Sequence, residues 1–266
     1  MKFLSKAYFG LVMAFFYLPI AVLIAFSFNS SKSRTVWTGF TFDWYKELFR
    51  NDQILSALGT TLIVALVASV AATVLGTAAA FGIHSMNKRM RGWVLNFTYL
   101  PIISPEIITG VSLLLLFVFL KIQLGYTTLI LAHITFNVPY VILSVMPKLR
   151  QMDKHIYEAA LDLGCNPRKA FFKVVIPEIM PGIVTGFLMA VTFSLDDFVV
   201  SYFTHGATAQ TLSVAIFSMT RRKVSPEINA LSTIVFIVVL AVLLASNLYD
   251  AKKEEKKRKA IARERV

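Results

Sequence analysis

Six long apolar segments constrain this chain more than any other feature. Each is close to, or longer than, the about 20 residues that an α-helix needs to cross a bilayer. Little chain remains between them for a soluble domain, and the longest connectors cover residues 29–56, 148–181 and 205–228. We therefore predict an all-α membrane protein with one transmembrane domain over residues 1–250 and a basic tail over 251–266. The predicted spans cover residues 7–28, 57–83, 93–120, 127–147, 182–204 and 229–249.

Lysine and arginine predict the orientation of these spans, because basic residues near span ends are retained in the cytoplasm. The N-terminus, residues 84–92, residues 148–181 and the tail carry 2, 3, 6 and 8 of them. The three alternate connectors carry 4, 1 and 3. Both termini are therefore predicted to lie in the cytoplasm.

Composition excludes several classes of function. The net charge of +12 does not indicate a nucleic-acid partner, because the basic residues lie between apolar segments. The basic tail is expected to fix topology or to touch anionic lipid. Cys165 is the only cysteine, and no Cys/His cluster, HExxH or Ser/His/Asp arrangement is present, so we expect neither a metal site nor a catalytic site. The chain also lacks a phosphate-binding loop for ATP, and no cofactor of its own is expected.

The third span contains a predicted break. In LPIISPEIITG, Pro101 and Pro105 each remove a helix donor, and Ser104, Pro105 and Glu106 have the pattern of an N-cap, a first-turn proline and a first-turn acid. Broken backbone at membrane depth is tolerated where it is buried in protein or lines a water-filled cavity. Glu106 is thus expected either to compensate a helix N-terminus or to line a path.

The fifth span carries two adjacent acids in TFSLDDFVVS, Asp196 and Asp197. Charges in a membrane are costly and usually face an interior or an aqueous path. On one continuous helix, counted at about 1.5 Å per residue from Gly182, the pair would lie in the outer half of the bilayer. A polar stripe would run along that helix. The more specific interpretation of the acidic pair is a site in the translocation path that attracts cations. The stripe comprises Ser194, Asp197, Ser201 and Thr204.

Two structural interpretations of the acidic pair stay open. The pair could cap the end of a shorter span and meet water, or it could bind a basic residue on another helix. In the fourth span, His133 and Asn137 lie one turn apart and are expected to make interhelical hydrogen bonds.

The connector over residues 148–181 is predicted to fold into a cytoplasmic helix-turn-helix. An apolar stripe of helical spacing begins at Ile156, and Gly164 stands where a C-terminal glycine belongs. Asn166 and Pro167 then form a cap and a first-turn proline for a second short helix, which Pro177 and Pro181 are expected to end. Such a hairpin could lie on the bilayer or fit into a cytoplasmic partner.

A family resemblance rests on this connector. Its motif is similar to the EAA, three residues, G, about eleven residues, I-P pattern of permease subunits of type I ABC importers. Further segments resemble polyamine (spermidine/putrescine) permeases of that family, and they include WTGFTFDWYKELF, LAHITFNVPYV and SLDDFVVSYF. Those permeases often have Asp at the position of Glu106. The motif residues are Glu158, Ala159, Ala160, Gly164, Ile176 and Pro177.

The resemblance implies a permease subunit of an ATP-driven importer in the cytoplasmic (inner) membrane. Its connector would couple to an ATPase dimer that uses ATP and Mg, and its other partners would be a homologous second permease and an extracytoplasmic substrate-binding protein. The small cationic substrate would be a polyamine. The substrate pathway would include Asp196, Asp197, Ser194, Glu106 and Trp44.

Two alternatives remain from the sequence. The first is a permease of the same class for another solute, either a metal cation or an anion. The second is an ion-coupled secondary transporter in which Asp196, Asp197, Glu106 and His133 form a relay. A compact docking hairpin argues against the second, because a secondary transporter has no use for one.

Overall fold

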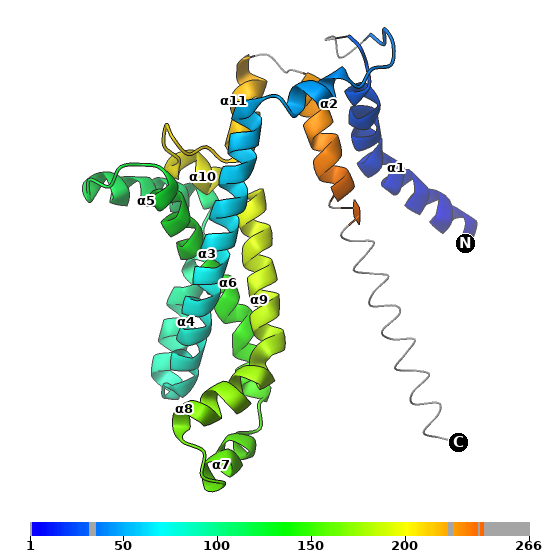
Figure 1. Cartoon of the computed structure of the whole chain (residues 1–266). Helices are drawn as coiled ribbons and strands as arrows, with labels where there is room; N and C mark the ends of the chain where they lie inside the picture. The colour runs from blue at the N-terminus through cyan, green and yellow to red at the C-terminus, as the bar shows by residue number, and fades with distance from the viewer. Residues whose placement is uncertain (1, 32–35, 223–225, 239, 242–266) are drawn as a thin grey trace. The chain divides into compact units, whose positions relative to one another are not determined.

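A computed structural model describes residues 2–31, 36–222, 226–238, 240 and 241. Within these residues the chain is helical, with two isolated β-bridges and no strand (Figure 1). The chain divides into two compact units. Unit 1 comprises residues 1–52 and 218–266, and unit 2 comprises residues 53–217.

The helices follow one another through short connections. They are α1 (Lys2–Ser27), α2 (Asp43–Leu48), α3 (Asp52–Ser85), α4 (Lys88–Ile103), α5 (Glu106–Phe119), α6 (Tyr126–Gln151), α7 (Lys154–Asp162), α8 (Pro167–Ala170), η1 (Phe171–Val175), α9 (Ile176–Asp196), α10 (Val199–Thr204) and α11 (Leu212–Arg222). An apolar helix over Pro226–Val238 follows.

Long apolar helices confirm a multi-pass membrane architecture. Four are long and apolar enough to cross a bilayer, over Ser5–Ser27, Asp52–Ser85, Tyr126–Gln151 and Pro167–Asp196, and the bent pair α4 and α5 makes up to five. The sixth predicted span, residues 229–249, falls partly on Pro226–Val238, and most of the remainder lies outside the described residues. The sixth span stays a prediction, and so does the tail over residues 251–266, which lies outside the described residues.

Unit 2 is built around the packing of α9 on α6. Gly182, Gly186 and Ala190 recur every four residues along α9 and are buried. A Cβ at Gly182 would lie 2.8 Å from the carbonyl oxygen of Ser144, so only glycine permits this approach of the two helices. Close packing through small residues replaces the hydrophobic effect between helices in lipid.

The fifth predicted span, residues 182–204, is wrong as a single helix. The structure has one helical run from Pro167 to Asp196 and then a break at Asp197, whose ψ of 124° is extended. The prediction that Pro177 and Pro181 end a second short helix is also wrong. Both prolines lie within this run: Pro177 comes directly after the π-helical turn η1, and Pro181 lies inside α9.

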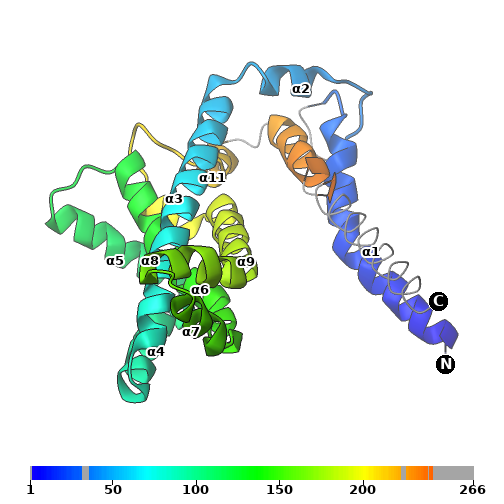
Figure 2. The ribbon, with the colours of Figure 1, turned by 60° about the horizontal axis from the view of Figure 1, so that its bottom comes forward.

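The break predicted in the third span is confirmed. Helix α4 continues through Pro101 to Ile103, and α5 leaves it at an angle of 102° (Figures 1 and 2). Spans three and five are therefore both interrupted, one near Glu106 and one at Asp197.

Candidate functional site

The segments that follow the two breaks pack against each other. Helices α5 and α10 meet at Gly110, where a Cβ would lie 2.9 Å from the ring of Phe203 and 3.4 Å from the carbonyl oxygen of Val199. The breaks themselves border one cavity of about 210 Å³ in unit 2. Its lining residues are Pro101, Glu106, Thr109, Phe136, Tyr140, Phe193, Asp196, Asp197, Phe198, Val199 and Val200.

The lining of this cavity is acidic and aromatic. Glu106 comes from the start of α5, and Asp196 and Asp197 come from the end of α9. Among the described residues that line the cavity, none is Lys, Arg or His. Since a negative wall attracts cations and repels anions, this site is suited to a positively charged solute.

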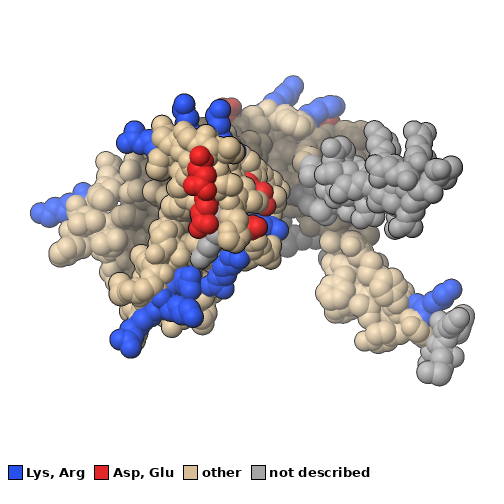
Figure 3. Space-filling model, turned by 90° about the horizontal axis from the view of Figure 1, so that it is seen from below, with Lys and Arg blue, Asp and Glu red and all other residues tan. Residues whose placement is uncertain are grey.

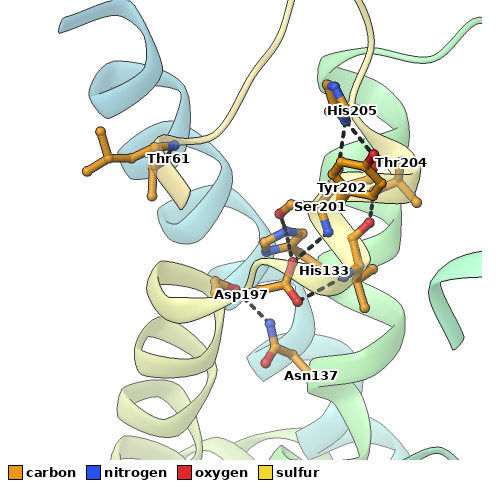
Figure 4. Close-up of polar contacts among 11 residues, drawn as sticks. Thr61, His133, Asn137, Asp197, Ser201, Tyr202, Thr204 and His205 are labelled. Atoms are coloured by element: carbon orange, nitrogen blue, oxygen red, sulfur yellow. Dashed lines mark hydrogen bonds and ion pairs between the residues drawn. The ribbon is translucent and has the colours of Figure 1, made fainter. Parts of the chain in front are cut away.

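The two adjacent aspartates differ in their surroundings, and Figure 4 shows those of Asp197, which lies beside Ser201 and His133. The side chain of Asp197 is 6% exposed. Its Oδ1 accepts from the backbone N–H of Val200 at 3.2 Å, and its Oδ2 accepts from that of Ser201 at 2.6 Å. Asp197 therefore caps the restarted helix α10, whereas Asp196 is exposed and makes no hydrogen bond or ion pair within the described part of the chain. One acid supports the break and its neighbour is available to a solute.

Helix α6 supplies buried polar partners to the broken fifth span. His133 is fully buried, and its Nε2 lies 3.1 Å from Ser201 Oγ and 3.6 Å from Asp197 Oδ2. One turn further on, Asn137 Nδ2 donates to Ser194 Oγ at 2.8 Å. These contacts confirm the interhelical hydrogen bonds predicted for His133 and Asn137.

Most of the predicted polar stripe faces helix α6 and is not part of the cavity. Ser194, Ser201 and Thr204 are buried, and the carbonyl oxygen of Thr204 accepts from Thr128 Oγ1 at 2.8 Å. The structure places Ser194 outside the cavity lining, so its assignment to the substrate pathway stays a prediction. The stripe joins two helices because the break at Asp197 lets residues before and after it contact α6 together.

Glu106 is the first residue of α5, and it is exposed at the cavity. The predicted N-cap at Ser104 is wrong, since no side-chain hydrogen bond caps α5 and Ser104 instead ends α4. The N–H of Ser104 donates to the carbonyl oxygen of Leu100 at 3.0 Å, so the backbone of Ser104 belongs to the end of α4.

Trp44 lies in unit 1, in helix α2, and its assignment to the substrate pathway stays a prediction. Its indole is buried, and Nε1 donates to the carbonyl oxygen of Asn29 at 2.6 Å. Beside it, the pKa of Asp43 lies below its ordinary value because the Thr41 hydroxyl donates to it and Lys46 lies 3.2 Å away. Within this unit, Trp44 fixes the chain between α1 and α2.

In the hairpin α7 to α8 the predicted helix end at Gly164 and the predicted cap at Asn166 are present, while the predicted end of the second short helix is absent because the chain continues into α9. Asp153 caps α7, Gly164 has the left-handed φ of +85° that follows a helix end, and the Asn166 side chain accepts from the N–H of Lys169. Glu158, Ala159 and Leu163 are exposed, and Leu163 is 87% exposed. Of the other motif residues, Ala160 and Ile176 are half-buried and Pro177 is exposed.

The base of this hairpin is anchored in the core of unit 2. Phe171 packs edge-on against Phe81 of α3 at a ring-centroid distance of 4.8 Å, and Tyr157 packs on the buried cluster around Val145 and Ile179. Figure 3 shows acidic side chains gathered in a strip with basic side chains around it at the lower end, seen from below. An exposed tip on a fixed base suits a docking element.

Sequence reasoning missed the aromatic part of the cavity. Phe136 and Tyr140 of α6, Phe193 of α9 and Phe198 of the break all line the cavity, and the rings of Tyr140 and Phe193 contact each other. Phe and Tyr are frequent in apolar spans. The spacing of Phe136 and Tyr140, one helical turn apart in the run that holds His133 and Asn137, was the only signal available.

Comparisons with known proteins agree with this architecture. Residues 72–252 match the family described as binding-protein-dependent transport system inner membrane component. The chain is 42% identical over 259 residues to the putrescine transport system permease protein PotI of Escherichia coli (strain K12), covering 94% of this chain and 92% of the relative. It is 37% identical over 250 residues to the spermidine/putrescine transport system permease protein PotC of Haemophilus influenzae, covering 94% and 97%.

Solved structures share the fold. A chain of a bacterial ABC transporter involved in the import of the acidic polysaccharide alginate superposes with a TM-score of 0.70 at 13% identity, covering 94% of this chain and 95% of that chain. A chain of the alginate transporter in complex with a pentasaccharide-bound periplasmic protein gives a TM-score of 0.69 at 17% identity, with 92% of each covered. The family match over residues 72–252 and the near full-length relatives together establish that this chain belongs to the binding-protein-dependent transport system inner membrane components, which are transport subunits and not enzymes.

Proposed function

We propose that this chain is a membrane-spanning permease subunit of an ATP-driven importer and that it moves polyamines such as putrescine and spermidine into the cytoplasm. The observation that carries the substrate class is the cavity between the two helix breaks. It presents Glu106, Asp196 and Asp197 and, among its described lining residues, no basic side chain. Carboxylates are the natural partners of ammonium groups.

The relatives support the choice of a polyamine over other cations. The relatives PotI and PotC are named as putrescine and spermidine/putrescine permeases, and each aligns with 94% of this chain. A metal-cation permease is the competing proposal, since carboxylates also bind metal ions. Among the described residues, no group of three or more His, Cys, Asp or Glu side chains is arranged to hold a metal ion.

The hairpin α7 to α8 is proposed to dock into an ATPase subunit. Its exposed face combines Glu158 with Ala159 and Leu163, while its base packs on α3 and α6. A movement of the docked tip would therefore be transmitted to the helices that border the cavity. An ATPase dimer would supply ATP and Mg²⁺ chemistry, and a homologous permease and an extracytoplasmic binding protein would complete the complex.

The proposed topology has six spans and both termini in the cytoplasm. It places the hairpin on the same side as the ATPase, because residues 148–181 are rich in lysine and arginine. In this arrangement the chain alternates between outward-open and inward-open states and makes no covalent bond.

Uptake by the reconstituted complex tests the substrate class. The chain is purified with the subunits that assemble with it, placed in vesicles, and assayed for uptake and ATPase stimulation with putrescine, spermidine, divalent metal ions and organic anions. We expect stimulation by the polyamines alone. Stimulation by an anion or only by a metal ion would overturn the polyamine proposal.

The coupling role is tested at the hairpin tip. We expect Glu158→Ala to abolish substrate-stimulated ATPase activity or to release the ATPase subunits, without changing which solutes are moved. Asp162→Ala is the matched control, because it removes the same charge from an exposed position of the same helix, at one of the three residues that the motif leaves unspecified. Equal effects of the two substitutions would contradict a specific role for Glu158.

A further inference from the structure

Two aromatic rings form a pair across the cavity wall. Tyr140 of α6 and Phe193 of α9 have ring centroids 4.4 Å apart and an interplanar angle of 48°. Both side chains are half-buried, so part of each remains accessible. The other two rings of the lining contact further aromatic partners, Phe136 with His133 at 5.1 Å and Phe198 with Phe217 at 4.7 Å. Tyr140 and Phe193 thus pair with each other beside the carboxylates.

The faces of aromatic rings attract cations. The quadrupole of Phe or Tyr places negative charge on the ring face, and the attraction to an ammonium group grows when the group leaves bulk water. A transport site must also release its solute, so it benefits from several weak contacts in place of one tight ion pair. A cavity wall that combines aromatic rings with carboxylates can attract a cation and can also release it.

The geometry points to an ammonium subsite in which Tyr140 and Phe193 contact the cation while Glu106 and Asp196 neutralise its charge. This inference rests on the proposed function and narrows it to one chemical group, a primary or N-alkylated ammonium. The volume of about 210 Å³ is below the roughly 300–1,000 Å³ of sites that enclose whole drug-sized ligands. The subsite is therefore suited to a small, slender amine and not to a drug-sized ligand.

Fluorinated phenylalanines at position 193 test the contact. Each added fluorine withdraws electron density from the ring face and changes ring size only slightly, so the attraction to a cation falls while the steric packing is kept. We expect putrescine uptake by the reconstituted complex to fall stepwise from phenylalanine to the trifluoro analogue, by about 2- to 30-fold in total. The same series at Phe97, an exposed residue of α4 that does not line the cavity, is the control and is expected to be flat.

Substitution of Tyr140 gives a second measurement. Tyr140→Phe keeps the ring face and should retain at least half of the uptake rate, whereas Tyr140→Leu should lose as much as the trifluoro series does. A flat series at position 193, or equal uptake by the Phe and Leu variants, overturns the subsite while amine uptake by the unsubstituted complex remains. Absence of amine uptake by the unsubstituted complex overturns the proposed function and the subsite with it.

An ammonium group also occurs in the headgroup of phosphatidylethanolamine. The fluorine series is therefore repeated in vesicles of phosphatidylglycerol alone, which carry no amine. A stepwise decrease in both lipid compositions supports a solute subsite. A decrease confined to vesicles that contain phosphatidylethanolamine would assign the rings to lipid contact and overturn the proposal.

Discussion

The two helix breaks of unit 2 each interrupt a span, but different residues stabilise them. The break between α4 and α5 follows Pro101 and contains Pro105, and no side-chain hydrogen bond caps the helix that restarts at Glu106. The break between α9 and α10 contains neither proline nor glycine. There the Asp197 carboxylate accepts two backbone N–H groups, and His133 lies beside it. The first break is encoded by prolines, and the second depends on side chains, namely the Asp197 carboxylate and His133 of another helix.

The two breaks show which acids support the backbone and which are exposed to a solute in the cavity. At the second break, Asp197 is nearly buried and committed to α10, and Asp196 is exposed at the cavity. At the first break, Glu106 is exposed and is not used as a cap. We infer that Glu106 and Asp196 are the acids available to a cation and that Asp197 holds the site in shape.

Asp197→Ala is expected to have the largest effect. The substitution removes a helix cap and leaves the N–H groups of Val200 and Ser201 without their acceptor in a nearly dry environment. We expect a loss of about 2–4 kcal/mol in the free energy of unfolding. Chemical denaturation in mixed detergent and lipid micelles measures this loss.

Asp196→Ala is the matched control for Asp197→Ala. It removes the neighbouring charge from an exposed position, so the free energy of unfolding should change by less than about 0.5 kcal/mol while polyamine uptake falls strongly. Equal destabilisation by the two substitutions would remove the distinction between a supporting acid and a solute-facing acid.

The link from α6 to the end of α9 is expected to have the next largest effect. Asn137 Nδ2 and Ser194 Oγ, 2.8 Å apart and both buried, can be tested by a double-mutant cycle. We expect Asn137→Ala and Ser194→Ala to be non-additive, with a coupling free energy of about 1 kcal/mol. A coupling of zero in unfolding experiments would show that the fifth span does not depend on this bond.

Pro105→Ala should have a smaller effect, because the first break is local. Alanine can adopt the φ of −55° and ψ of 134° found there, so the expected cost is the extra unfolded-state entropy, about 0.4–1 kcal/mol. Pro101→Ala lies inside α4 and regains a helix donor, so it should be neutral or stabilising. A cost for Pro105→Ala as large as that for Asp197→Ala would show that the two breaks are not different in kind.

The same contrast explains what the sequence could predict. Prolines act on their own backbone, so the break near Glu106 and the hairpin with Gly164 and Asn166 were predictable from local chemistry. The break at Asp197 was not, because in LDDFVVS nothing local forbids a helix, and the extended Asp197 is stabilised by contacts with α10 and by residues of α6. The cavity-facing role of Asp196 and the ring pair of Tyr140 and Phe193 depend on how α6 and α9 pack, which sequence periodicity does not specify.

The smallest expected effect concerns a cap that is absent from the structure. Ser104 stands where the sequence predicts an N-cap, yet it makes no capping bond to α5. Ser104→Ala should therefore change the free energy of unfolding by less than about 0.5 kcal/mol. Amide hydrogen exchange at the start of α5 should stay unchanged. Asn166→Ala is the comparison, because the Asn166 side chain accepts from the N–H of Lys169 at 2.8 Å. That substitution should cost about 1 kcal/mol and speed hydrogen exchange in α8. Faster exchange in α5 of the Ser104→Ala protein would mean that Ser104 caps α5 in solution and that the first break, too, depends on a side chain.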